Sequence, residues 1–273
     1  MRIIAVADLH GNLPEDVPEC DLLIIAGDIC PHFGKIADMP GSVRDVEGQA
    51  SWLLTAFKPW LESQPAKQIL GCWGNHDFVG QYTVQFADIF RELPWILLED
   101  EETVYPNAYQ SEEGLCIYGT PYTRRYGSWA FMEEEGELAK RFARIPEDLD
   151  ILISHGPPMW ACDRAAGDNG DRLGSEALYD RIRTMQKPPK HLICGHIHGG
   201  KGWGTVFGEY GSTQVWNVAS VDEAYQLHTP SWTEITLDGK AKSKPALEMS
   251  TVSDVGAVSD QQSMSVVLGD ETK

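Results

Sequence analysis

The feature that most constrains the fold is a pattern that occurs five times along the chain. A short apolar run is followed, directly or after one glycine, by aspartate, asparagine or histidine, which are residues that bind metal ions. Runs that are apolar on both faces are typical of strands in a sheet covered on both sides. The five runs are Ile3 to Ala7, Leu22 to Ala26, Lys67 to Trp73, Ile151 to Ser154 and His191 to Cys194. Because the carboxyl ends of parallel strands meet at one edge of a sheet, the pattern predicts that the polar residues gather there.

Longer segments between these runs have apolar residues at helical spacing. They predict helices at Val43 to Ser63, Tyr82 to Glu92, Phe131 to Arg144 and Glu176 to Met185. Pro59 predicts a kink or an early end in the first of them. Further strands are predicted at Leu115 to Gly119, Thr205 to Phe207, Thr213 to Ala219 and Trp232 to Leu237. This α/β alternation with a β-rich end favours two sheets packed face to face, with helices outside.

The chain has 273 residues, enough for one domain with a full core. We expect residues 1–239 to form that domain. From Lys240 to Lys273 the sequence turns polar and serine-rich and contains almost no aromatic residues. Such a composition buries too little apolar surface to fold, so we expect a disordered tail.

The formal net charge of −19, from 41 acidic and 22 basic residues, disfavours binding to DNA or RNA. An acidic protein that acts on an anionic substrate needs a local source of positive charge, and bound metal would supply it. No apolar run reaches membrane-spanning length, and the N-terminal run is too short for a signal peptide. The six cysteines are scattered and contain no C-x-x-C pair, which fits a reducing, cytoplasmic location. The oligomeric state is not indicated.

The motifs at the run ends carry the chemistry. In Asp8-Leu9-His10 the two polar residues are two apart, so on an extended chain both side chains point the same way. The other motifs are Gly27-Asp28, Gly74-Asn75-His76-Asp77, Ser154-His155-Gly156-Pro157-Pro158 and Gly195-His196-Ile197-His198-Gly199. A lone aspartate after a strand is usually a turn or a helix cap, and a lone histidine is more often structural than a ligand. Five such motifs in one chain favour a shared metal centre.

In this order the motifs D-x-H, G-D, G-N-H-D, H-G and G-H-x-H resemble the signature of the calcineurin-like metallophosphoesterases, over roughly residues 1–238. The resemblance implies a four-layer α/β/β/α sandwich of two mixed sheets, with a two-metal site at the carboxyl ends of the strands. It implies that Asp8, His10 and His198 bind one metal. It also implies that Asn75, His155 and His196 bind the other and that Asp28 bridges both.

The resemblance also implies that His76 is a catalytic acid rather than a ligand, that Asp77 orients it, and that Asn75 and His76 contact the substrate. A general acid typically contributes ~10²–10⁴-fold to the rate. Asn12 follows the first motif and is a further candidate for substrate binding, although a tight turn at Gly11-Asn12 explains these residues equally well.

Within the family the chain looks most like the class III phosphodiesterases and the MPPED-type (metallophosphoesterase-domain-containing) proteins. The similarity lies in Ser154 to Pro158, Gly195 to Gly202 and Asn217 to Ser220. Asp28 is followed by Ile29-Cys30-Pro31-His32, where the protein Ser/Thr phosphatases have an aspartate-arginine-glycine tract. The sequence therefore favours a phosphodiesterase that acts on small or cyclic-nucleotide phosphodiesters through a metal-bridging hydroxide.

Mixed nitrogen and oxygen ligands suit Mn, Fe, Zn, Co or Ni, and we expect two divalent ions, Mn²⁺ first. Three other functions stay open: a phosphomonoesterase, a metal-binding scaffold without activity, and a nuclease, which the charge disfavours. Outside the motifs, Arg164 or Arg172 is a candidate substrate contact, with surface ion pairing as the alternative. His32 is a candidate for the pocket, with a solvated loop as the alternative. The aromatic segment Pro121 to Tyr126 would either flank a base or aryl group or pack in the core.

Overall fold

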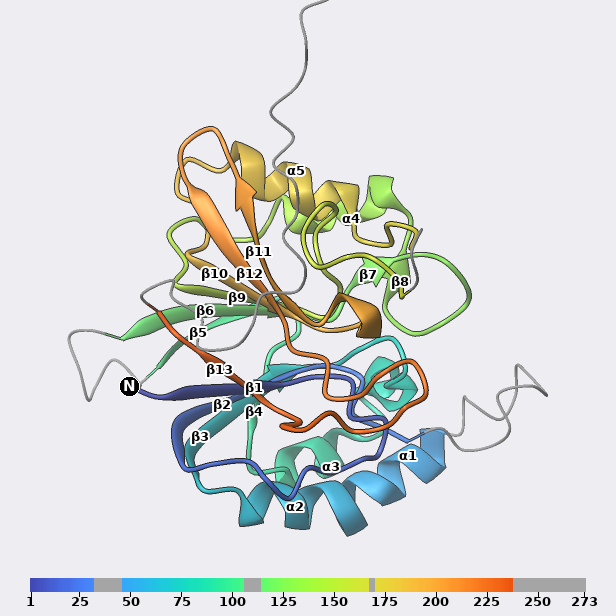
Figure 1. Ribbon diagram of the computed structural model, residues 1–273. Helices are drawn as coiled ribbons and strands as arrows, with labels where there is room; N and C mark the ends of the chain where they lie inside the picture. Colours follow the sequence, from blue (N-terminus) through green and yellow to red (C-terminus); the bar gives the residue numbers. More distant parts are fainter. Residues whose placement is uncertain (32–45, 106–113, 167–169, 238–273) are drawn as a thin grey trace, which may run out of the picture.

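The computed structural model describes residues 1–31, 46–105, 114–166 and 170–237 (Figure 1). Two mixed sheets pack face to face and helices cover the outer face of each sheet (Figure 1). The predicted four-layer α/β/β/α sandwich is therefore confirmed. The predicted tail from Lys240 and the candidate His32 lie outside the described residues, and the proposed domain limit at residue 239 stays a prediction.

The first sheet has the strand order β13-β1-β2-β3-β4. Its strands are β1 (Ile3–Val6), β2 (Cys20–Ala26), β3 (Ala66–Cys72), β4 (Ile96–Leu97) and β13 (Thr233–Ile235). All pairs are parallel except that of β1 with β13. The carboxyl ends of β1, β2 and β3 therefore lie together at one edge, with the first three polar motifs directly after them.

The second sheet has the order β11-β12-β10-β9-β6-β5. Its strands are β5 (Glu101–Tyr105), β6 (Leu115–Thr120), β9 (Ile151–Ser154), β10 (His191–Cys194), β11 (Gly202–Phe207) and β12 (Ser212–Asn217). The four inner strands are parallel, and the edge strands β5 and β11 are antiparallel to their neighbours. The last two polar motifs follow β9 and β10 at the centre of this sheet.

The helices form the outer layers (Figure 1). Below the first sheet lie α1 (Val46–Trp52), the π-helical turn η3 (Leu53–Phe57), α2 (Lys58–Ser63) and α3 (Ala87–Glu92). Above the second sheet lie α4 (Glu135–Phe142) and α5 (Glu176–Thr184). Short 3₁₀ turns are η4 (Phe78–Tyr82) and η5 (His198–Gly200), and β7 (Thr123–Arg124) pairs with β8 (Met132–Glu133) in a separate small sheet.

Strand β2 shows why the runs are apolar on both faces. Leu22 and Ile24 belong to the core between the two sheets, whereas Leu23 and Ile25 belong to the core between the first sheet and its helices. Trp216 closes the inter-sheet core on the side of the second sheet. Each strand of this kind is buried on both sides, and burial of one such apolar side chain contributes roughly 1.5–3 kcal/mol.

The helix that was expected at Val43 to Ser63 does not end at Pro59. It continues to Ser63, and its first three residues lie outside the described part. The π-helical turn Leu53–Phe57 ends two residues before Pro59. A widened turn accommodates a residue that has no N–H and whose ring crowds the preceding turn.

Two other helices are shorter than expected. The segment Tyr82 to Glu92 becomes helical only at Ala87, after the 3₁₀ turn η4. The segment Phe131 to Arg144 becomes helical only at Glu135, because Met132–Glu133 pairs with β7 instead. Strand β5 was not predicted, since its glutamates mark a solvent-facing edge strand rather than a buried one. Within the residues that the structure describes, no helix is long and apolar enough to cross a membrane.

Candidate metal centre

The backbone turns sharply at the residues after the strands. Asp8, His10, Asp28 and His196 have left-handed φ angles of 56°, 44°, 53° and 68°. For residues other than glycine this conformation is uncommon and concentrates at functional sites. The loops after β1 and β2 support each other, because the Asp8 N–H donates to the Gly27 carbonyl at 2.9 Å and the His10 N–H donates to the Asp28 carbonyl at 2.9 Å.

The glycines of the motifs give these loops room. Gly27 has a φ of 88°, and a Cβ there would overlap the His155 ring. A Cβ on Gly74 would overlap both the backbone and the carboxylate of Asp28. The G-D and G-N-H-D motifs therefore need glycine for close approach between loops of the two sheets.

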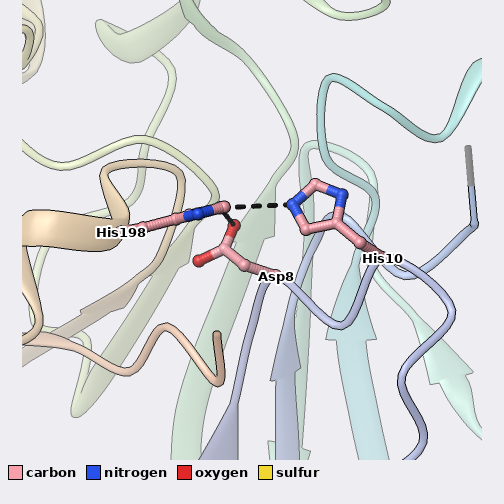
Figure 2. Close-up of side chains that lie close together, drawn as sticks. All are labelled: Asp8, His10 and His198. Carbon is pink, nitrogen blue, oxygen red and sulfur yellow. Dashed lines mark hydrogen bonds and ion pairs between the residues drawn. The ribbon is translucent and has the colours of Figure 1, made fainter. Parts of the chain in front are cut away.

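The first group of possible ligands is Asp8, His10 and His198. Figure 2 shows the two imidazoles pointing toward each other beside the Asp8 carboxylate, with 3.2 Å between the two Nε2 atoms. His198 Nε2 lies 4.0 Å from Asp8 Oδ1. The Asp8 carboxylate also accepts the His196 N–H at 2.9 and 3.0 Å, which joins a first-sheet loop to a second-sheet loop.

The second group is Asp28, His155 and His196. His155 Nε2 lies 3.3 Å from Asp28 Oδ2 and 2.9 Å from Asn75 Oδ1. Asp28 Oδ2 is also 3.7 Å from His10 Nε2, so one carboxylate oxygen faces a histidine of each group. The structure thus brings all seven predicted ligands together, with Asp28 between the two groups.

His76 lies beside Asp28 and faces the cavity. Its Nε2 is 3.9 Å from Asp28 Oδ2, and its N–H donates to Asp28 Oδ1 at 2.7 Å. Its ring packs on Trp129 with 4.3 Å between centroids. His76 also forms a third possible ligand group with His10 and Asp28.

Asp77 is buried and holds two ligand loops together. Its carboxylate accepts the N–H groups of Ile29, Cys30 and Gly74 at 2.8 to 3.2 Å. It therefore links the loop after β2 to the loop after β3, which carry Asp28 and Asn75. The proposed orienting action of Asp77 on His76 stays a prediction. Burial, followed by the repulsion of Asp28, raises the pKa of Asp77 to about 6.

In the second group Asp28 and His155 stabilise each other's charged forms. Burial acts to raise the pKa of Asp28. The neighbouring imidazoles, of which His155 has the largest effect, act in the opposite direction and hold this pKa well below its ordinary value. Burial lowers the pKa of His155, but Asp28 outweighs it and raises that pKa to about 9. Burial and then His155 lower the pKa of His196 to about 3, which leaves a neutral imidazole suited to metal binding.

Burial also raises the pKa of Asp8 to about 6, against the opposing effect of His198 and His155. Nearby positive charge therefore favours the ionised forms of both buried carboxylates, Asp8 and Asp28. Donor atoms around one ion at about 2 Å lie roughly 3–4 Å apart, and the donor atoms of each group lie within 4.8 Å of one another. Carboxylate and imidazole donors in this arrangement fit two divalent transition-metal ions, whose binding would displace the proton from His155.

A cavity of about 570 Å³ opens above these groups. Asn75 and His76 line it together with Asp28, His196 and His198. The rim residues include Arg124, Arg125, Tyr126, Arg172, Leu173, Glu223 and Tyr225. The segment Pro121 to Tyr126 therefore divides: Tyr122 packs against the hydrophobic core, whereas Tyr126 lies at the cavity.

Asn12 is not among the residues that line this cavity. Its N–H donates to the Leu9 carbonyl at 2.6 Å and closes a tight turn, in agreement with the second explanation of Gly11-Asn12. Substrate binding by Asn12 stays a prediction.

Two residues near the centre were not predicted. The Asn217 side-chain amide donates to the carbonyls of Gly195 and Ile197 at 3.3 and 2.9 Å, so it fixes the loop of the G-H-x-H motif. Tyr225 lines the cavity and packs edge to face on the rings of His10 and His198, with 4.9 and 5.4 Å between centroids. The position of Asn217 at a strand end was the available signal, whereas nothing in the sequence around Tyr225 indicates its place.

Comparison with known proteins agrees with this geometry. The sequence model of the calcineurin-like phosphoesterases matches residues 1–200. Metallophosphoesterase domain-containing protein 1 of Homo sapiens is 28% identical over 74% of this chain and 61% of its own length. A UPF0046 protein of Caenorhabditis elegans is 36% identical over 74% of this chain and 52% of its own length.

A third relative is "Probable rhamnogalacturonate lyase C" of Emericella nidulans, 30% identical over 74% of this chain but over only 17% of its own length. The chain thus spans less than two thirds of the length of each of these relatives. A solved crystal structure superposes with a TM-score of 0.54 over 80% of this chain and 90% of that one, at 14% identity. That likeness concerns the fold alone.

Proposed function

The chain belongs to the calcineurin-like phosphoesterase family, and on that premise we propose that it is a metal-dependent phosphodiesterase for small or cyclic-nucleotide phosphodiesters. The observation that carries the proposal is the cavity over the two ligand groups. It is lined by Asp28, Asn75 and His76 and also by Tyr126 and Tyr225. Family membership implies a two-metal centre, and the donor groups of this chain fit one.

Different residues of the chain would bind the metal ions and donate the proton. Two bound divalent ions lower the pKa of water toward neutrality and neutralise charge on the phosphoryl oxygens. Asp28 faces both ligand groups and would hold the ions at a fixed separation. His76 lines the cavity next to Asp28, where it would donate a proton to the oxygen of the leaving group.

The preference for diesters is supported by the aromatic and apolar part of the rim. A diester keeps a second organic group after the first ester bond has broken, and Tyr126, Leu173 and Tyr225 offer surface for it. Phosphomonoester hydrolysis by the same centre is the alternative, since the metal chemistry is common to both.

A panel of substrates with metal-reconstituted protein tests this proposal. The metals are Mn²⁺, Fe²⁺, Zn²⁺, Co²⁺ and Ni²⁺, and we expect Mn²⁺ to support the highest rate. The substrates are bis(nitrophenyl) phosphate, nitrophenyl phosphate, 2′,3′- and 3′,5′-cyclic nucleotides and single-stranded DNA. We expect metal-dependent turnover of the diesters, abolished by a chelator, and little cleavage of DNA. Faster hydrolysis of the monoester would contradict the preference for diesters.

A cytoplasmic location is part of the proposal. All six cysteines are free thiols, and four of them are buried, as expected of a protein from a reducing compartment. The net charge of −19 supports a small anionic substrate bound at metal rather than a nucleic-acid partner.

A further inference from the structure

A buried ion pair fixes one arginine on the wall of the metal cavity. Arg172 lines the cavity and its Nη1 donates to Asp163 Oδ1 at 2.6 Å. The Asp163 side chain is 0% exposed and that of Arg172 is 18% exposed, so this pair is not the surface ion pair that the sequence suggested as the alternative. A buried carboxylate that needs a cation keeps this guanidinium in place.

The same guanidinium is held from a second side. Arg172 Cζ lies 4.4 Å from the centroid of the Trp160 ring. The backbone N–H of Trp160 donates to Asp163 Oδ2 at 3.1 Å. Trp160 has a left-handed φ of 74°, which non-glycine residues rarely adopt. The carboxylate and the indole therefore orient Arg172 before any ligand arrives, and such preorganisation lowers the entropic cost of binding.

This arginine loop is also fixed relative to the metal ligands. The Asn217 amide donates to the Cys162 carbonyl at 3.2 Å as well as to the Ile197 carbonyl at 2.9 Å. A Cβ on Gly200 would overlap the Cys162 carbonyl, so the segment after His198 packs directly on the loop. Asp163, which follows Cys162 and binds Arg172, is therefore connected to the loop that carries His198.

Two further arginines line the same cavity. Arg125 Nε lies 3.0 Å from Glu134 Oε1, and Arg124 Nε lies 3.9 Å from Glu135 Oε1, with 41% of the Arg124 side chain exposed. Arg124 is thus only loosely paired. The gathering of three arginines at one cavity is unexpected in a chain with a net charge of −19. Two acidic residues, Asp171 and Glu223, line the cavity besides Asp28.

We propose that these three arginines, the arginine wall (Arg124, Arg125 and Arg172), bind a second anionic group of the substrate, with Arg172 as the principal contact. The preferred substrate is then a phosphodiester that carries a further oxyanion, a carboxylate or a phosphate, on the ester group that stays away from the metals. This inference rests on the proposed phosphodiesterase activity. Guanidinium suits both kinds of oxyanion, because its fork of N–H donors matches their geometry.

Three matched nitrophenyl aryl phosphodiesters test it with the metal-loaded protein. One has an unsubstituted phenyl group, one a meta-carboxylate and one a meta-phosphonate, which is not itself hydrolysed. We expect kcat/KM to be roughly 10- to 100-fold higher for an anionic ester, which is the range of one or two charge-assisted hydrogen bonds. The better of the two anionic esters identifies the oxyanion. In Arg172→Gln the preference should collapse, mainly because KM rises much more for the anionic esters than for the unsubstituted ester.

Arg124→Gln is the second variant, because its loss leaves no buried carboxylate unpaired, and we expect a smaller loss of the same preference. Arg91→Gln, on the exposed face of α3, is the matched control and should keep the full preference. Equal rates for the three esters, or an equal loss on all three esters in both Arg172→Gln and Arg124→Gln, would overturn the inference but leave the phosphodiesterase intact. No metal-dependent turnover of any ester would overturn both.

Discussion

The two sheets contribute unequally to the metal centre. The first-sheet side, after β1, β2 and β3, supplies both candidate ligand carboxylates, the amide of Asn75, the candidate ligand His10 and the proposed acid His76. The second-sheet side, after β9 and β10, supplies histidines alone, namely His155, His196 and His198. The negative charge of the centre therefore comes from one half of the molecule and most of its neutral nitrogen donors from the other.

The two sides are also held by opposite chemistry. On the first-sheet side the Asp77 carboxylate accepts backbone N–H groups of the ligand loops. On the second-sheet side the Asn217 amide donates to backbone carbonyls. Direct contacts between the sides include the bond from the His196 N–H to Asp8 and the 2.9 Å contacts of the His155 ring with the Ala26 carbonyl oxygen and with Asn75 Oδ1. Bound ions would add the strongest link between the sides, which suggests that metal stabilises their relative position.

The largest loss of metal binding and turnover is expected when the negative charge of Asp28, on the first-sheet side, is removed. Asp28→Asn should lose both metals and reduce turnover on the order of 10⁴-fold or more, because each ion contributes several kcal/mol of charge stabilisation and 1.36 kcal/mol is tenfold in rate. Metal analysis and turnover of bis(nitrophenyl) phosphate measure this. Asp88→Asn, on exposed α3, is the control. Retention of two ions would show that Asp28 does not bridge.

The next largest loss is expected at His76, also on the first-sheet side, and it should affect the catalytic rate but not metal binding. His76→Ala should keep both ions and lose ~10²–10⁴ in kcat, the range of a general acid. The loss should be much smaller for a substrate whose leaving group needs no proton, such as nitrophenolate, than for an alkyl ester. If the variant loses one ion, then His76 is a ligand with His10 and Asp28 instead.

A smaller effect is expected on the second-sheet side from the amide that fixes its histidine loop. Asn217→Ala removes the bonds to Gly195 and Ile197 without adding volume at this buried position, and should weaken metal affinity about 10- to 100-fold, as loss of an outer partner of a ligand typically does. Calorimetric titration with Mn²⁺ measures the change. Unaltered affinity for both ions would mean that the histidines are positioned without Asn217.

The smallest effect concerns Lys201, also on the second-sheet side, whose ammonium donates to the Ala219 carbonyl. Burial lowers its pKa from 10.5 to about 8. Between these values the unfolded chain binds more protons than the native one, so this group makes stability rise with pH. Lys201→Met should abolish that rise, which is at most about 1.4 kcal/mol per pH unit. Chemical denaturation of the native chain and of Lys201→Met at pH 7, 9 and 10 measures this pH dependence. If the free energy of unfolding changes with pH equally in both proteins, the lowered pKa of Lys201 is contradicted.

The ligand-bearing strands were predictable because each is apolar on both faces and ends at a polar motif. The same pattern placed Asp8, Asp28 and His155 near one another before any coordinates. Tyr225 could not be found in this way, and for Arg172 the sequence left a substrate contact and a surface ion pair as alternatives. They lie in loops whose positions depend on left-handed turns and on contacts far apart in the sequence, such as that of Asn217 with Cys162. The helix ends were missed for a similar reason, since a π turn before Pro59 and the small β7–β8 sheet are tertiary features.

The central claim is that the two sheets hold two metal ions which together support phosphodiester hydrolysis. It is tested most directly by adding Mn²⁺ to metal-free protein while metal content and turnover of bis(nitrophenyl) phosphate are followed in the same samples. We predict that binding saturates at two ions per chain and that turnover rises fully only as the second ion binds. Saturation at one ion, or full turnover at one ion per chain, would contradict the account.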